Sequence, residues 1–335
     1  MAAFGLLLLA VLLAVSNGTL EITPSQTWNA IQKGLSGQSL EGLEAIVWNL
    51  RLPRVVFAIL VGAALAASGV AMQGVFQNPL ADPYLVGVAS GAAFGATVAI
   101  FLTSSAAPAF APALFSARAA GSGLVPIFAF FGAILAVSLT ILLSGTARGS
   151  RNALILSGVV IGSMITAITT YIQLFDADRL RAVFSWTLGN LALAGWSEVL
   201  VVLPIALLGL GLLLLLAKPL DALQLGEDTA QTLGIRVLWL KIAVIVAASL
   251  MTAAAVSFAG IIGFVGLVAP HIMRRLCGAA HRPLIIASAL AGSSLLLLSD
   301  LGARTLIRPQ ELPVGIVTTL LGGPFFLWLM RKGGL

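Results

Sequence analysis

Charge-free apolar runs alternate with short polar stretches along almost the whole chain. A helix needs about 20 apolar residues to cross a hydrocarbon core of about 30 Å. Backbone groups in lipid must be hydrogen-bonded internally, so such runs predict helices and not open strands. The pattern predicts an all-α fold with ten membrane-spanning helices, at residues 2–20, 55–76, 84–103, 124–144, 152–174, 196–217, 237–257, 260–275, 284–301 and 313–330.

The stretch 237–273 decides between nine and ten spans. It is too long for one helix, and glycines and Pro270 interrupt its second half. With two spans here, five basic residues near the C-terminus lie inside and two outside, whereas a single span inverts the ratio. The five are Arg274, Arg275, Arg282, Arg331 and Lys332, and the two are Arg304 and Arg308. The positive-inside rule therefore predicts ten helices with both termini in the cytoplasm.

The composition places the chain among polytopic membrane proteins. Hydrophobic residues make up 59% of its 335 residues and charged residues 9%, and the mean hydropathy is +1.08. Soluble domains carry about 25% charged residues. The net charge of +6 comes from Lys and Arg scattered singly between apolar runs, which favours topology signals over a nucleic-acid-binding patch. We expect a single transmembrane domain over residues 1–335, with an outer loop at 21–50.

Two features of the composition bear on cofactors and on the N-terminus. The single cysteine, Cys277, excludes an internal disulfide and a cysteine-based metal site, and we expect this chain to bind no cofactor. Residues 2–20 carry no charge, and no positive segment precedes them as it would in a secretory signal peptide. They are therefore interpreted as a first transmembrane helix.

The longest polar stretch between two apolar runs lies at residues 218–236. Within it, Glu227 and Asp228 stand at the start of a short helical pattern, where acidic residues favour the positive end of the helix dipole. Gly234 is placed to end this helix in a left-handed turn. We interpret the stretch as a site that another protein grips, and the alternative is an ordinary solvated loop.

Several classes of active site are absent from the sequence. The predicted spans have no ionisable residue in their middles, where proton relays and ion-coupled carriers need one. His271 has no second ligand nearby on its helix, so a structural role is favoured over metal binding. No lysine follows a glycine, which excludes a Walker A loop, and neither HExxH nor GxSxG occurs. We expect no enzyme, and any energy for uphill transport must come from a partner protein.

Eight basic residues fall on the predicted outer side, where the positive-inside rule does not favour them. They are Lys33, Arg51, Arg54, Arg118, Arg179, Arg181, Arg304 and Arg308. Arg51, Arg54 and Arg304 meet at the outer mouth, where three guanidiniums could clasp carboxylates of a docking protein. Snorkelling arginines that anchor helix ends are the alternative.

Five motifs occur in one order along the chain. They are LRLPR at 50–54, QNPLADP at 77–83, LGEDTAQTLG at 225–234, GFVGLVAPH at 263–271 and ELPVGIV at 311–317. Together they resemble the FecCD family, the membrane subunits of type II bacterial ABC importers for iron complexes and cobalamin. The resemblance spans about residues 50–331.

The resemblance implies a ten-helix permease of the bacterial inner membrane, which acts as a homodimer or pairs with a similar subunit. It implies two cytoplasmic ATPase subunits, which carry the ATP and Mg, and a periplasmic substrate-binding protein outside. Arg51, Arg54 and Arg304 match positions that contact acidic residues of the binding protein. The match to the coupling helix that seats in the ATPase covers Leu225, Gly226, Glu227, Asp228, Thr229, Leu233 and Gly234.

Asn78, Pro79 and Leu80 match the narrow inner end of the translocation path. The loop 146–152 is richer in arginine than in some relatives, so a gate role of Arg151 or Asn152 stays open. A weak repeat between residues 64–83 and 253–270 suggests two inverted segments broken by Gly and Pro, as in many transporters.

An iron(III)–siderophore is the expected cargo, with haem and cobalamin as alternatives. An ion-coupled secondary transporter and an intramembrane enzyme are the alternatives from other classes. If the coupling interpretation holds, reversing the charge of Glu227 and Asp228 together should uncouple transport while the protein stays folded.

Overall fold

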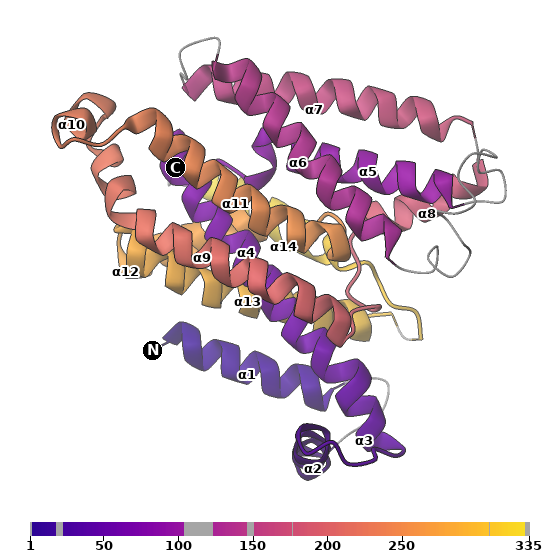
Figure 1. Cartoon of the computed structure of the whole chain (residues 1–335). Helices are drawn as coiled ribbons and strands as arrows, with labels where there is room; N and C mark the ends of the chain where they lie inside the picture. The colour runs from indigo at the N-terminus through magenta and orange to yellow at the C-terminus, as the bar shows by residue number, and fades with distance from the viewer. Residues whose placement is uncertain are drawn as a thin grey trace.

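The computed structural model describes residues 2–17, 23–103, 123–145, 151–175, 177–307 and 309–331, which form a helical bundle without strands (Figure 1). This confirms the all-α prediction for the described residues. The helices are α1 (Ala2–Ser16), α2 (Pro24–Leu35), α3 (Leu43–Ile46), α4 (Leu52–Phe76), α5 (Val88–Leu102), α6 (Leu124–Gly145), α7 (Arg151–Gln173), α8 (Ala177–Thr187), α9 (Trp196–Gln224), α10 (Glu227–Thr232), α11 (Val237–Ala259), α12 (Val265–Cys277), α13 (His281–Thr305) and α14 (Val314–Arg331). A π-helical turn, η1 (Val47–Arg51), precedes α4, and a 3-10 turn, η2 (Pro83–Val86), precedes α5.

Each of the ten predicted spans coincides with one of these helices. Among the described residues, seven helices are long and apolar enough to cross a membrane. The other three are α1, α5 and α12, which have 15, 15 and 13 residues. The chain is thus an integral membrane protein with at least seven candidate spans, and ten crossings remain a prediction.

The stretch 237–273 contains two helices. α11 ends at Ala259 and α12 begins at Val265, and between them Gly260 and Phe264 have φ values of +72° and +68°. A positive φ is incompatible with a right-handed helix, so both positions break it; Gly260 adopts this backbone without steric cost, whereas Phe264 does not.

A second break lies between α4 and α5, and it contacts the first. The hydroxyl of Tyr84 in η2 donates to the carbonyl oxygen of Ile262 at 3.0 Å and accepts from its N–H at 3.2 Å. The end of the first weakly similar segment thus lies next to the break in the second one. Their inverted orientation stays a prediction.

The central helices are α4, α11 and α13, which are mostly buried, whereas α7 and α9 are mostly exposed. Close approach of α4 to its neighbours depends on glycines. A Cβ at Gly69 would lie 1.9 Å from the carbonyl oxygen of Gly266 in α12, and one at Gly62 would lie 2.5 Å from that of Gly292 in α13. Small residues at these crossings let transmembrane helices pack backbone to backbone.

Three features differ from the sequence prediction. The expected outer loop 21–50 contains α2, which Thr23 caps through a capping box. The amphipathic α8 was not predicted, and Arg179 on it donates to the carbonyl oxygen of Phe101 at the end of α5, at 3.0 Å. The expected loop 218–236 begins only at Leu225, because α9 continues through Pro219 to Gln224.

Both chain ends lie at the end of the bundle that carries α10, called here the α10 end, whereas α3 and α8 lie at the opposite end (Figure 1). The predicted arrangement, with both termini on the side of the coupling segment, agrees with this. That this side is the cytoplasm stays a prediction. Of the residues used for topology, Arg118, Arg148, Arg308 and Lys332 lie outside the described residues, as does loop 146–150; of Arg151 only the backbone is described.

Candidate functional site

At the α10 end, the chain forms the short helix that the sequence predicts. Gly226 precedes α10 with φ +114°, and Gly234 follows it with φ +81°. The N–H of Gly234 donates to the carbonyl of Gln231 at 2.9 Å, and the N–H of Ile235 donates to that of Ala230 at 3.1 Å. These bonds close the helix end in the manner of a glycine C-cap, so the helix and its left-handed end are confirmed.

The two faces of α10 differ in what they contact. Ala230 is fully buried, and Glu227 accepts a hydrogen bond from Nζ of Lys241 on α11 at 2.9 Å. In contrast, Leu225 and Leu233 are 70% and 62% exposed, and the neighbouring Asp228 and Thr229 are exposed as well. Two large apolar side chains are thus left uncovered beside polar ones, as expected of a docking surface.

The pairing of Glu227 changes one expectation from the sequence. The Lys241 side chain is only 3% exposed, and Glu227 is its carboxylate partner. An arginine at position 227 would place two cations together, one of them buried, at a substantial free-energy cost. The double charge reversal should therefore destabilise the fold, and Asp228 alone is the position that tests docking.

The tail of α9, immediately before α10, is tied to α4 by two amide side chains. Gln77 Nε2 donates to the carbonyl oxygen of Leu223, and Gln224 Nε2 donates to that of Gly74 at 3.1 Å. These bonds join the segment before α10 to the end of α4. A displacement of α10 is therefore transmitted to the end of α4.

The same tail is tied to α13. Asp221 Oδ1 accepts the backbone N–H of His281 at 2.8 Å and lies 2.6 Å from its Nδ1. This carboxylate satisfies an N–H in the first turn of α13, which has no side-chain cap from its own N-cap residue. The three contacts also explain why α9 extends past Pro219, because its polar residues find partners inside the protein.

The predicted path residues lie directly beyond α4. Gln77 adopts a left-handed φ of +47°, and Asn78 Oδ1 accepts the N–H of Leu80 at 2.9 Å, which fixes a tight turn. Asn78, Pro79 and Leu80 are all exposed. Their role at the inner end of a path remains a prediction.

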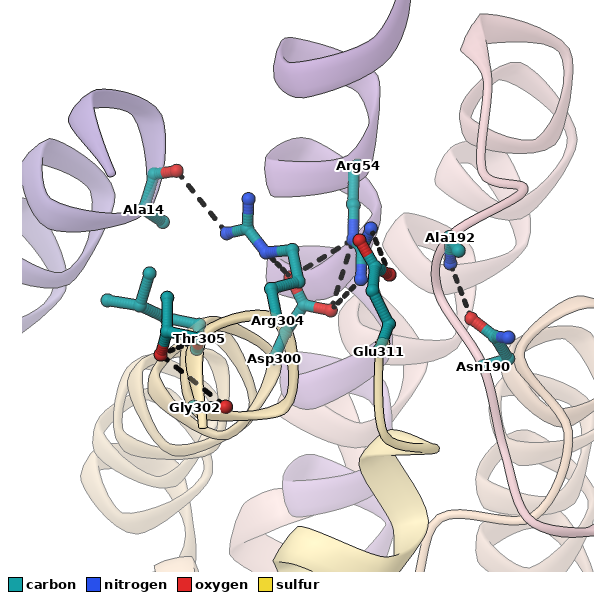
Figure 2. Close-up of polar contacts among 10 residues, drawn as sticks. Ala14, Arg54, Asn190, Ala192, Asp300, Gly302, Arg304, Thr305 and Glu311 are labelled. Carbon is teal, nitrogen blue, oxygen red and sulfur yellow. Dashed lines mark hydrogen bonds and ion pairs between the residues drawn. The ribbon is translucent and has the colours of Figure 1, made fainter. Parts of the chain in front are cut away.

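At the opposite end, the three predicted arginines come together but are engaged inside the protein. Arg54 donates from Nη2 to Asp300 at 2.8 Å and from Nη1 to Glu311 at 3.0 Å (Figure 2). Arg304 pairs with the same Asp300 through Nε at 3.1 Å. The Asp300 side chain is fully buried, whereas that of Glu311 is 36% exposed.

Two of these arginines also cap a helix. Arg51 Nη1 donates to the carbonyl oxygen of Val15 at 2.7 Å, and Arg304 Nη2 donates to that of Ala14 at 3.3 Å. These carbonyls belong to the last turn of α1, where helical backbone acceptors lack partners and the helix dipole is negative. Arg51 and Arg304 thus have a structural function in anchoring α1, and binding-protein docking on the three arginines stays a prediction.

The sequence prediction missed the carboxylates of this cluster as partners of the arginines. The signal for Asp300 was present, because it stands four residues before Arg304 on one helix, a spacing that brings side chains together. No local pattern links Arg54 to Glu311, 257 residues away.

Comparison with known proteins identifies the family. A sequence profile of the FecCD transport family matches residues 6–332. The chain belongs to the FecCD transport family. Its members named below are permeases of ABC transporters, so this FecCD chain is a transport subunit of that kind.

Curated relatives of this FecCD chain are similar over most of their length. The hemin transport system permease protein HmuU of Yersinia pestis is 40% identical, over 98% of this chain and 94% of that protein. The cobalamin import system permease protein BtuC of Halobacterium salinarum is 41% identical, over 87% of this chain and 74% of that protein.

A solved structure supports the same assignment. An inward-facing metal-chelate type ABC transporter superposes with a TM-score of 0.81 at 32% identity, and the match covers 99% of both chains. The arrangement of helices described above is therefore that of a known ABC permease.

Proposed function

We propose that this chain is the membrane-spanning subunit of an ATP-driven importer that moves an iron(III)–siderophore, or a similar iron complex, across the inner membrane of a bacterial cell. The observation that carries the proposal is α10, an exposed helix flanked by uncovered Leu225 and Leu233 and tied through the α9 tail to α4. The metal-chelate type of the solved relative supports an iron complex as cargo.

In this proposal, each partner is assigned to a surface at one end of the bundle. Two ATPase subunits dock on the α10 helices of a permease dimer in the cytoplasm, and α10 contributes its exposed Asp228 and Thr229 to that contact. A periplasmic binding protein docks at the opposite end, over the cluster of Arg51, Arg54 and Arg304. A second copy of this chain faces the exposed turn at Asn78–Leu80 and completes the path.

The mechanism uses the connections inside the chain. Closure of the ATPases displaces α10, and the α9 tail transmits the movement through Gln224 and Gln77 to the end of α4. The turn that holds Asn78 and Leu80 then shifts at the inner end of the path. The cargo passes between two copies without a tight site in either.

Haem and cobalamin are the alternative cargoes, since the relatives named above include a hemin and a cobalamin permease. An ion-coupled carrier is disfavoured by the described helices. The buried Lys241 and Asp300 lie near helix ends in ion pairs, where they support the fold.

Uptake by cells with and without the gene tests the proposal. Labelled ferric siderophore, haem and cobalamin are supplied before and after ATP depletion. We expect loss of ferric-siderophore uptake alone in the deletion strain, and loss in wild-type cells on ATP depletion. Loss of haem or cobalamin uptake would change the cargo, and uptake that survives ATP depletion but needs an ion gradient would contradict the importer.

A further inference from the structure

A cavity of about 340 Å³ lies at the α10 end, between the end of α4, the α9 tail and α12. Its wall includes Gln73 from α4, Gln224 from α9, and His271, Arg274 and Arg275 from α12. The cavity is large enough for a small polar group and falls at the low end of the volumes of ligand sites.

The wall of this cavity is cationic and rich in donors. Two of its residues are arginines, and none of the described residues that line it is Asp or Glu. Two of its side-chain acceptors already have donors: Gln73 Oε1 accepts from Arg274 Nη2 at 2.9 Å, and Asn78 Oδ1 accepts the N–H of Leu80. A ligand with hydrogen-bond acceptors is therefore favoured, and the positive charge of the two arginines disfavours a cation.

Three nitrogens on these lining residues are buried without a hydrogen-bond partner in the described structure. They are Gln73 Nε2, His271 Nε2 and Arg274 Nε. Gln73 and His271 are only 3% and 8% exposed. A buried N–H donor without a partner costs free energy, and native proteins contain few of them, so the unpaired N–H groups of Gln73 and Arg274 beside this cavity favour a bound acceptor.

We propose that this cavity binds an oxyanion of the phosphate or carboxylate class, held by the guanidiniums of Arg274 and Arg275 and by the amide of Gln73. Arginine suits such groups because its N–H donors match two anion oxygens at once. The anion comes either from solution or from the headgroup of an anionic lipid in the facing leaflet.

The position of the site gives the anion a structural effect. It would bridge α12 to the end of α4, beside the two amides that tie α4 to the α9 tail. Occupancy would therefore stiffen the connection between α10 and the turn at Asn78. Binding itself does not depend on the proposed import activity and is measured on the permease alone.

The test is binding of ³²P-labelled inorganic phosphate to the purified full chain in phosphatidylcholine nanodiscs. We expect saturable binding, weakened at least about tenfold in Arg275→Gln and in Gln73→Glu, because each change removes a donor that binds the anion or adds a competing carboxylate. The matched control is Arg282→Gln, which removes an equal charge from an exposed residue at the same end but outside the cavity.

The variants are chosen so that folding does not obscure the result. Gln73→Glu keeps the shape of the side chain and places a carboxylate where Arg274 already donates, so this variant should stay folded. Its melting temperature is recorded beside the wild-type value.

A second set of nanodiscs containing phosphatidic acid distinguishes the two sources. A lipid headgroup is identified by two results together. Phosphate binding is lost in these nanodiscs, and native mass spectrometry shows phosphatidic acid retained by wild type but not by Gln73→Glu. Unchanged phosphate binding identifies a soluble anion. The proposal is overturned if Arg282→Gln weakens phosphate binding as much as Arg275→Gln. It is also overturned if wild type shows no saturable phosphate binding and retains phosphatidic acid no better than Gln73→Glu.

Discussion

Asp300 is the residue on which the cluster opposite α10 depends. Its fully buried carboxylate accepts from Arg54 and pairs with Arg304, two side chains that are themselves largely buried. Burying such charges is costly, and the pairs persist because each charge has a partner. Glu311 binds Arg54 as well, but at the surface, where water screens an ion pair.

Two neutral substitutions should separate these roles. Asp300→Asn leaves the buried Arg304 without its carboxylate partner and leaves Arg54 with only Glu311 at the surface, so it should lower the free energy of unfolding by about 3–5 kcal/mol. Glu311→Gln should lower it by about 0–1 kcal/mol. Thermal unfolding of both variants in the same detergent measures the difference, and equal losses would show that Asp300 is not the central partner.

At the scale of elements, α10 is held on one face and open on the other. Glu227 faces the buried Lys241, whereas Asp228 is exposed. A change of charge at position 227 should therefore affect folding, whereas a change at position 228 should affect docking of the ATPase.

Asp228→Arg should leave the melting temperature within a few degrees of wild type and abolish most ATP-dependent uptake, because it alters only the docking surface. Glu227→Arg should reduce the yield of folded protein, because it leaves the buried Lys241 beside a second cation. Size-exclusion profiles and uptake assays report the two effects. Normal uptake by a folded Asp228→Arg protein would contradict the coupling assignment.

Helix crossings supply a further prediction at this scale. Gly69→Ala places a methyl group against the carbonyl oxygen of Gly266 and should destabilise the protein by about 1–3 kcal/mol through overpacking. Gly211→Ala on α9 is the control, because nothing lies within 4 Å of its added Cβ and alanine is the better helix former. Thermal unfolding compares the two, and a Gly69→Ala protein as stable as the control would show that α4 and α12 separate at little cost.

At the scale of the molecule, the bundle has one buried set of helices and a broad apolar exterior. α7 exposes large side chains along its length, among them Leu156, Met164 and Tyr171. Lipid and a second permease subunit are the two surroundings that fit such a surface. The proposed dimer places the turn with Leu80, which is 42% exposed, opposite its copy.

Cross-linking tests the dimer. In a Cys277→Ser background, Leu80→Cys should give a covalent dimer with a short thiol-reactive cross-linker in membranes, because the two copies meet at the path. Leu12→Cys is the control: it is 63% exposed on α1, and α1 lies on the far side of the bundle from α7 (Figure 1). Equal cross-linking of both variants would indicate random collision.

The positions of the spans could be predicted from the sequence because lipid imposes a strict requirement on length and polarity. The extension of α9 through Pro219 could not, since its polar tail is stabilised by Gln77 and His281 from distant parts of the chain. The amphipathic α8 was missed for a related reason: its charged residues resemble a loop until Arg179 is seen to contact α5. The arginines were placed at one end correctly, but Asp300 stands 246 residues from Arg54.

The cap on α1 has a consequence for the order in which the protein is assembled. Arg304 follows Ala14 by 290 residues, and at about 5–20 residues per second its synthesis comes about 15–60 s later. During that interval the distant partner of α1 at this end is Arg51, beside the local bond from Asn17 Nδ2 to the carbonyl oxygen of Leu13. Nascent chains that stop before α13 therefore lack the second cap, and α1 gains its last described partner only near the end of synthesis.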